Sequence, residues 1–167
     1  GVPIWGGCSN QSKKRITNIQ KRAIRTVTKS YSNSHTEPRM KQIKSLNFED
    51  TYKHQTLLLT FDCIHNIAPS ELCKLIKPEI ICDGPTLRSH ASNSINLIPP
   101  RSNTKVTSYS FSVNGPNLWN SIPEELKTLK KRHIFKESIK RSFLNNYHNK
   151  AVCSNPRCRD VRYHTAN

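Results

Sequence analysis

Apolar residues recur at helical spacing in several separate stretches of the chain, so the sequence predicts a mainly helical protein. The clearest example covers residues 11–29, where Ser9 and its polar neighbours can cap the helix start. If each residue advances by about 100° around the axis, one stripe of this helix is apolar. The stripe consists of Ile16, Ile19, Ala23, Ile24 and Val27. We expect it to dock on a buried neighbouring helix.

A second helix is expected from Phe48 to about Asn66, with Asn47 as its cap and Glu49 and Asp50 in its first turn. Apolar side chains occupy most of its circumference, which predicts the central buried helix of the fold. Shorter helices are predicted at residues 37–46, 70–76, 124–129 and 134–147.

Residues 107–113 predict a strand instead, because Phe111 and Val113 alternate with polar residues. Gly115-Pro116 would end it, and residues 94–98 could pair with it as a hairpin. Between this strand and the following helix, Phe111, Leu118 and Trp119 are expected to form an apolar packing clasp. The predicted fold class is therefore mainly α with a small β-hairpin: a helical bundle followed by a small mixed α/β C-terminal region.

The charge of the chain predicts the class of its partner. The 167 residues include 27 Lys and Arg against 11 Asp and Glu, a formal net charge of +16. Such an excess destabilises a compact chain by self-repulsion unless a polyanion is bound, and nucleic acid is the expected polyanion. An anionic membrane surface is the competing partner, but no apolar run reaches the roughly 18 residues of a spanning helix.

The helix expected at residues 11–29 concentrates this charge on the face opposite its apolar stripe. Outer faces of helices are usually solvated, but they usually mix both signs of charge, and this helix contains no acid. Contact with phosphates is therefore expected from Lys14, Arg15, Lys21, Arg22, Arg25 and Lys29. A second basic cluster lies near the C-terminus, in residues 127–141, where Glu137 is the one acid.

Candidate metal ligands gather at the end of the chain. Cys153, Cys158 and His164 lie near the spacing of structural zinc sites without matching it, so residues 148–167 are expected to form a flexible tail and the zinc site is a weak alternative. The chain has no secretory signal pattern, and Cys63 and Cys73 lie within helical patterns. Free thiols in a reducing, intracellular compartment are expected.

No catalytic site is predicted. The adjacent carboxylates Glu49-Asp50 and Glu124-Glu125 both fit the first turns of helices, and the five glycines do not form a phosphate-binding loop. Serine, histidine and acidic residues are present, but nothing in their spacing places them together.

Three stretches resemble one family in the same order along the chain. Residues 110–126 read Ser-Phe-x-x-x-Gly-Pro-x-Leu-Trp-Asn-x-Ile-Pro-x-x-Leu. Residues 1–6, Gly-Val-Pro-Ile-Trp-Gly, are similar to a Tyr-Gly-x-Pro-x-Trp-Gly segment, and residues 19–25 are similar to a Leu-Gln-x-x-Gln-x-Arg-Ala-x-Arg helix. Together they resemble the C-terminal region of jockey-like non-LTR retrotransposon reverse transcriptases, over most of residues 1–147.

The resemblance implies the thumb and post-thumb part of an RNA-directed DNA polymerase. Residues 1–8 would end a missing palm domain, 9–76 would form a thumb-like helical bundle, and 77–147 would form the post-thumb region. The family's Tyr-x-Asp-Asp motif is absent from this chain, so the piece is expected to be inactive alone, and the divalent metal, Mg²⁺ by expectation, belongs to the parent enzyme.

The implied partners are RNA, DNA or an RNA–DNA hybrid, together with the missing palm and fingers, in a nuclear or cytoplasmic ribonucleoprotein. A stand-alone basic nucleic-acid-binding or assembly module derived from such an element is the alternative. A relic without a selected function is a third possibility.

Overall fold

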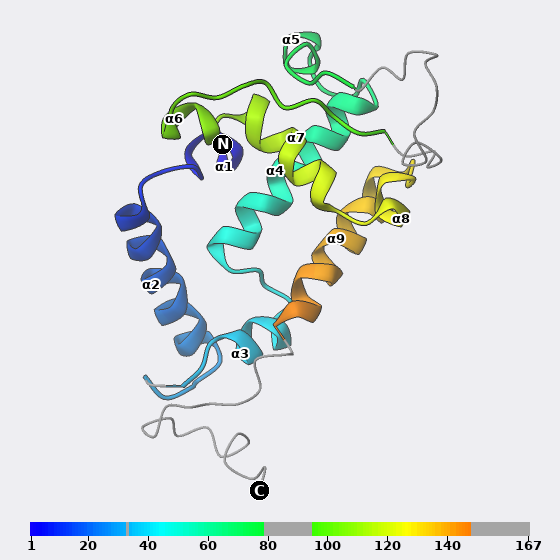
Figure 1. The fold of residues 1–167 in the computed structure, drawn as a ribbon. Coiled ribbons are helices and arrows are strands. Elements are labelled where there is room, and N and C mark those ends of the chain that lie inside the picture. Colours follow the sequence, from blue (N-terminus) through cyan, green and yellow to red (C-terminus); the bar gives the residue numbers. More distant parts are fainter. Residues whose placement is uncertain (33, 79–94, 148–167) are drawn as a thin grey trace, which may run out of the picture. The chain divides into compact units, whose positions relative to one another are not determined.

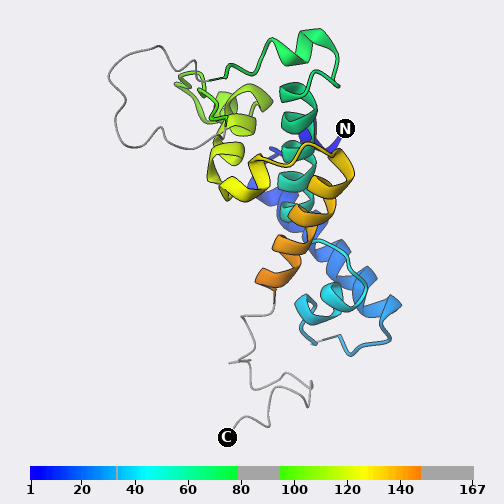
Figure 2. The ribbon, with the colours of Figure 1, turned by 90° about the vertical axis from the view of Figure 1, so that its right-hand side faces the viewer.

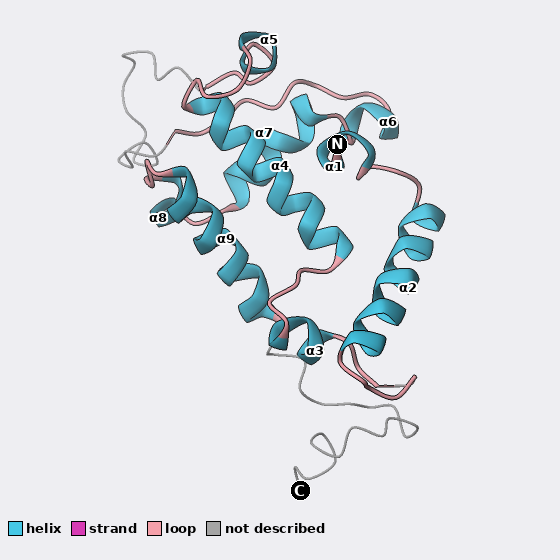
Figure 3. Cartoon of the chain, turned by 180° about the vertical axis from the view of Figure 1, so that it is seen from behind, coloured by secondary structure: helices cyan, strands magenta, loops and turns pink. Residues whose placement is uncertain are grey.

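The computed structural model describes residues 1–32, 34–78 and 95–147, and these residues are mainly helical, as the sequence predicts (Figure 1). The helices are α1 (Val2–Trp5), α2 (Asn10–Val27), α3 (Glu37–Gln42), α4 (Phe48–Ile64), α5 (Ser70–Cys73), α6 (Lys105–Ser108), α7 (Phe111–Ser121), α8 (Glu124–Lys127) and α9 (Arg132–Asn146). Within these ranges no strand forms, and the one β-bridge joins Pro78 to Leu97 (Figure 3).

The chain divides into two compact units. Of the described residues, unit 1 contains 1–7, 52–78 and 95–139, and unit 2 contains 8–32, 34–51 and 140–147. The boundaries fall within α4 and α9. The division into palm end, thumb and post-thumb region follows from the resemblance and stays a prediction.

The core of unit 1 forms around α4, which confirms the predicted buried helix. Phe61 of α4 and Phe135 of α9 are fully buried, and their rings stack with centroids 4.6 Å apart. Trp119 of α7 is 1% exposed, and its ring centroid lies 5.7 Å from that of Phe135. Three segments distant in sequence therefore meet in one aromatic cluster. Figure 2 shows the backbones of the three helices that carry these rings.

The strand expected at residues 107–113 is wrong, because this region contains α6 and the start of α7. Phe111 and Val113 alternate like strand residues, but so short a window also fits a helix. Val113, Pro116 and Trp119 are spaced by three residues and all are buried, which places them on one helical face. Burial of this face determines the conformation, despite Pro116 inside the helix.

Side chains of α7 hold the segment that was expected to complete a hairpin. The amide of Asn120 donates to the Leu97 carbonyl at 2.8 Å, and its oxygen accepts from the Leu97 N–H at 3.0 Å. The Trp119 indole N–H donates to the Ile95 carbonyl at 2.8 Å. These bonds satisfy backbone groups that a partner strand would otherwise satisfy, so residues 95–98 need no hairpin. Trp119 is a packing residue, as predicted, whereas Phe111 and Leu118 are half-buried.

Unit 2 is organised by the turn before α4. Asn47 caps the helix as predicted: its side-chain oxygen accepts from the Asp50 N–H at 2.7 Å. The Tyr147 hydroxyl donates to the Asp50 carboxylate at 2.5 Å and accepts from the Asn47 N–H at 2.9 Å. Burial, and next the hydrogen bond to Asp50, raises the pKa of Tyr147. The buried apolar side chains of this unit include Ile24, Met40, Leu46 and Phe48.

Burial of the whole apolar stripe of residues 11–29 is a second expectation that the structure corrects. Ile24 is 5% exposed, but Ile19 is 65% exposed and Val27 is 70% exposed. The helix packs through a neighbouring edge instead, where the Gln20 amide donates to the Leu46 carbonyl at 2.7 Å. Ala23 is also exposed, so an apolar edge of α2 remains on the surface.

Three of the six cysteines lie in the described part of the chain. Cys8, Cys63 and Cys73 are free thiols there; Cys63 is buried, and Cys8 and Cys73 are half-buried. The weak zinc candidates Cys153, Cys158 and His164 lie outside it. Across residues 1–32, 34–78 and 95–147, no helix is both long enough and apolar enough to cross a membrane.

Candidate nucleic-acid interface

Helix α2 is defined by signals at both of its ends. At its start the Ser9 hydroxyl accepts from the Ser12 N–H at 3.3 Å. At its end Lys29 adopts a positive φ of 48°, while the Ser30 N–H bonds the Arg25 carbonyl and the Lys29 N–H bonds the Thr26 carbonyl. This pair of bonds is the Schellman motif, which satisfies the last carbonyls of a helix. Lys29 therefore lies just beyond the helix that presents the other five predicted cations.

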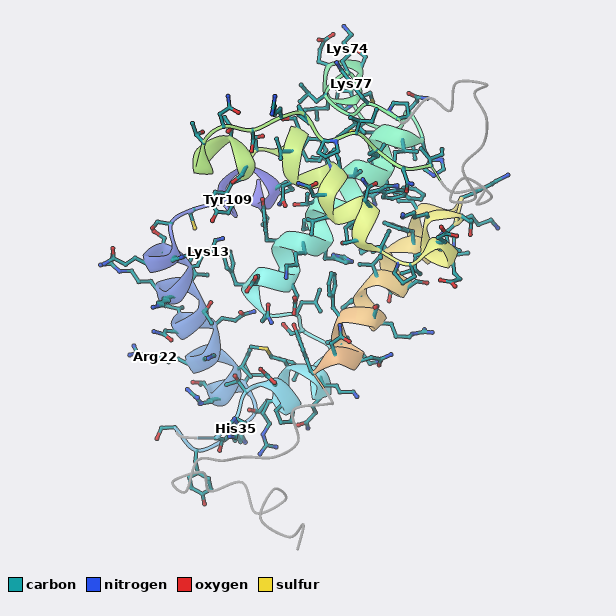
Figure 4. The ribbon with its side chains drawn as sticks, in the orientation of Figure 1. Lys13, Arg22, His35, Lys74, Lys77 and Tyr109 are labelled. Atoms are coloured by element: carbon teal, nitrogen blue, oxygen red, sulfur yellow. The ribbon has the colours of Figure 1, made fainter. Side chains whose placement is uncertain are left out.

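Those five cations occupy one sector of α2. At 100° per residue, Lys14, Arg15, Lys21, Arg22 and Arg25 fall within an arc of about 120°. Figure 4 shows the Arg22 side chain on the outer side of α2 and Lys13 on another side. The structure thus brings the predicted residues together on one face, and α2 contains no acid to neutralise them.

The five cations differ in how freely they can bind a ligand. Lys14, Arg15 and Arg22 are exposed, and within the described residues none of their charged groups makes a hydrogen bond or ion pair. Lys21 is half-buried. Arg25 is half-buried too, and its Nε–H donates to the Ser34 carbonyl at 3.1 Å, which ties α2 to the loop that follows. Sequence reasoning treated all five alike, because the contact to Ser34 arises only from the folded loop.

The dimensions of this face suit the backbone of a duplex. Lys14 and Arg25 are 11 residues apart, which corresponds to roughly 16 Å along the helix at about 1.5 Å per residue. A strand of a duplex advances about 3.4 Å per phosphate, so the face can span several phosphates. Lysine and arginine side chains there can bind phosphate oxygens and so position a duplex without reading its bases.

An apolar edge borders the cations, and sequence reasoning missed its exposure. Ile19, Ala23 and Val27 are exposed and lie beside Arg15 and Arg22 around the helix axis. The hydrophobic pattern alone could not reveal this, since it predicts burial of the entire stripe.

The carboxylate pairs behave as helix-entry residues. Asp50 accepts the Tyr147 hydroxyl and belongs to the cap of α4, and Glu124 and Glu125 lie exposed in the first turn of α8. Among the residues that the structure describes, no three His, Cys, Asp or Glu side chains are grouped so that they could hold a metal ion.

Comparison with known proteins adds no identification. A scan against protein-family models, a search of curated proteins and a search of solved structures each found no match to this chain.

Proposed function

We propose that this chain is the thumb-like and post-thumb part of a non-LTR retrotransposon reverse transcriptase of the jockey-like kind, and that α2 contacts the backbone of the primer–template duplex. The sequence resemblance supplies the class of parent protein. The observation that carries the binding role is the acid-free α2, on which Lys14, Arg15 and Arg22 are exposed together. Thumb-like here describes the helices of residues 9–76, which would hold the duplex while the catalytic metal and carboxylates reside in the parent enzyme.

The first test measures duplex binding as a function of salt. The α2 variant carries Lys14→Gln, Arg15→Gln and Arg22→Gln, which remove three exposed charges and leave the Arg25–Ser34 bond intact. The control variant carries Lys74→Gln, Lys77→Gln and Arg101→Gln, three exposed cations in unit 1. Fluorescence anisotropy with a labelled RNA–DNA hybrid gives the affinity of each protein over a range of salt concentrations.

The wild-type chain should bind unrelated duplex sequences with similar affinity. Each phosphate contact contributes about 0.9 to the slope of log K against log salt, so the α2 variant should lower that slope by roughly 2 to 3. The control variant should lower the slope by less than the value of about 0.9 that corresponds to one phosphate contact. If the slope of log K against log salt were the same for the wild type and the α2 variant, α2 would not be part of the interface. A strong preference for one base sequence would also contradict the proposal, since backbone contacts carry no sequence information.

The stand-alone module is the second candidate for the same surface. It predicts the same binding by this chain, but no effect of the chain on DNA synthesis. The two candidates can be separated by adding the chain to the fingers and palm of a jockey-like enzyme that lack their own thumb. Restored DNA synthesis on a primed RNA template supports the polymerase part. Unchanged synthesis supports the stand-alone module.

A further inference from the structure

Unit 1 carries its own basic surface in the connection from α8 to α9 and the first turns of α9. Residues 127–136 contain five Lys or Arg and no acid. This stretch can be followed in Figure 2 from α8, in yellow, into the lighter orange part of α9. The nearest acids along the chain are Glu124 and Glu125 before it and Glu137 after it, and all three are exposed.

Two of the five cations are used by the fold, and they hold the two ends of the connection. Lys127 donates to the side-chain oxygen of Asn96 at 3.2 Å and to the carbonyl of Asn120 at 3.4 Å. At the other end, Arg132 donates from Nε and Nη2 to the two carboxylate oxygens of Asp62, at 2.7 and 3.0 Å. Such a bidentate pair fixes geometry as well as charge.

The remaining three cations are Lys130, Lys131 and Lys136. All three are exposed, and within the described residues none of their ammonium groups makes a hydrogen bond or ion pair. The backbone beneath them is anchored, because the buried His54 ring of α4 donates from Nε2 to the Lys136 carbonyl at 3.1 Å. Three free ammonium groups thus lie on a segment whose position is already determined by contacts within unit 1. Less chain entropy is lost when such a segment binds a ligand.

We propose that Lys130, Lys131 and Lys136 form a second phosphate-binding surface for the same nucleic acid, carried by unit 1 and separate from the cations of α2. The inference rests on the proposed function, because it assigns the same class of ligand. Phosphate is a suitable ligand because lysines bind phosphate oxygens as point charges and need no shaped pocket. Nucleic acid is taken as its source because it is the ligand that the proposed function assigns to α2. The chain thus carries one basic face in each compact unit.

The test adds one variant to the salt titration. The unit 1 variant carries Lys130→Gln, Lys131→Gln and Lys136→Gln, which leaves Lys127 and Arg132 in their structural contacts. We expect the salt slope for the hybrid to fall by roughly 2 to 3, as for the α2 variant, and the combined six-site variant to lose about twice as much. The control Lys74→Gln, Lys77→Gln and Arg101→Gln has the same change in net charge. Unchanged circular dichroism and thermal midpoint establish that each variant is folded.

The salt slopes of the variants test the second surface separately from the proposed function. If the unit 1 variant has the wild-type salt slope while the α2 variant has a reduced slope, the proposal of a second surface is wrong and the proposed function stands. If neither variant changes the slope, both are wrong. A control that loses as much as the unit 1 variant would show that net charge alone matters and would overturn the second surface. So would a variant that binds hybrid normally but no longer binds phosphatidylserine vesicles, since the ligand would then be a membrane surface.

Discussion

At the scale of single residues, Asp62 and Cys63 are neighbours in α4 with contrasting surroundings. The Asp62 side chain is 13% exposed and pairs with Arg132, whose pKa is raised by that hydrogen bond. Cys63 is 4% exposed, and burial raises the pKa of its thiol from 9.0 to about 12, with smaller contributions from Cys73 and Asp62. The Asp62 charge is thus neutralised by Arg132, while burial keeps the adjacent Cys63 thiol protonated.

This environment predicts an unreactive Cys63. The thiolate is the nucleophile, and a pKa higher by about three units lowers the thiolate fraction at pH 8 about a thousandfold. Iodoacetamide should therefore label Cys8 and Cys73 of the folded protein long before Cys63, as followed by mass spectrometry of peptides. Denatured protein is the control, in which the three thiols should react at similar rates. Labelling of Cys63 as fast as Cys8 in folded protein would contradict its assigned environment.

At the scale of elements, the close approach of α7 to α4 depends on a glycine. A Cβ atom at Gly115 would lie 2.9 Å from the Thr60 hydroxyl oxygen and 3.1 Å from the Phe111 ring. Thr60 is constrained, because it is fully buried and its hydroxyl donates to the Thr56 carbonyl at 2.9 Å. The Gly-Pro pair therefore permits helix packing, where the sequence suggested the end of a strand.

Gly115→Ala should consequently destabilise unit 1. Overpacking of this kind typically costs about 1 to 3 kcal/mol in the free energy of unfolding, measured by denaturant titration. Adding Thr60→Ala removes the nearest atom, so the double variant should be less destabilised than the sum of the two single variants. Additive effects, or a Gly115→Ala protein as stable as wild type, would mean that the two helices are not in close contact at this position.

At the scale of the whole molecule, the net charge of +16 acts on stability as well as on binding. Within the described residues the ion pairs include Arg132 with Asp62 and the exposed pair Lys74 with Glu71. Far more cations than acids remain, and their mutual repulsion favours expansion of the chain.

Without nucleic acid, the thermal midpoint of the chain should rise with ionic strength. The Debye length falls from about 30 Å at 0.01 M salt to about 10 Å at 0.1 M, so repulsion between distant cations is screened over this range. A midpoint increase of a few degrees is expected by circular dichroism. The six-site variant lacking both basic faces should show a smaller increase. A midpoint that falls with added salt would show that ion pairs outweigh repulsion in this fold.

The positions of most helices could be read from the sequence because their signals are local. Asn47 with Asp50 caps α4, the near-continuous apolar surface of α4 marks it as the buried helix, and the acid-free run in α2 marks a basic face. These features depend on residues within a few turns of one another. The resemblance and the nucleic-acid role that it implies also come from the sequence and remain proposals.

Only the tertiary structure decided which face of each helix is buried. Phe111 and Val113 fit either a strand or a helix, and the choice came from packing Val113, Pro116 and Trp119 in the core of unit 1. Likewise, the edge of α2 that packs was determined by contacts to backbone distant in sequence, such as Gln20 to Leu46, and this left Ile19 exposed. The physical reason is common to both: a local pattern shows which side chains favour burial, but long-range contacts determine which of them are buried.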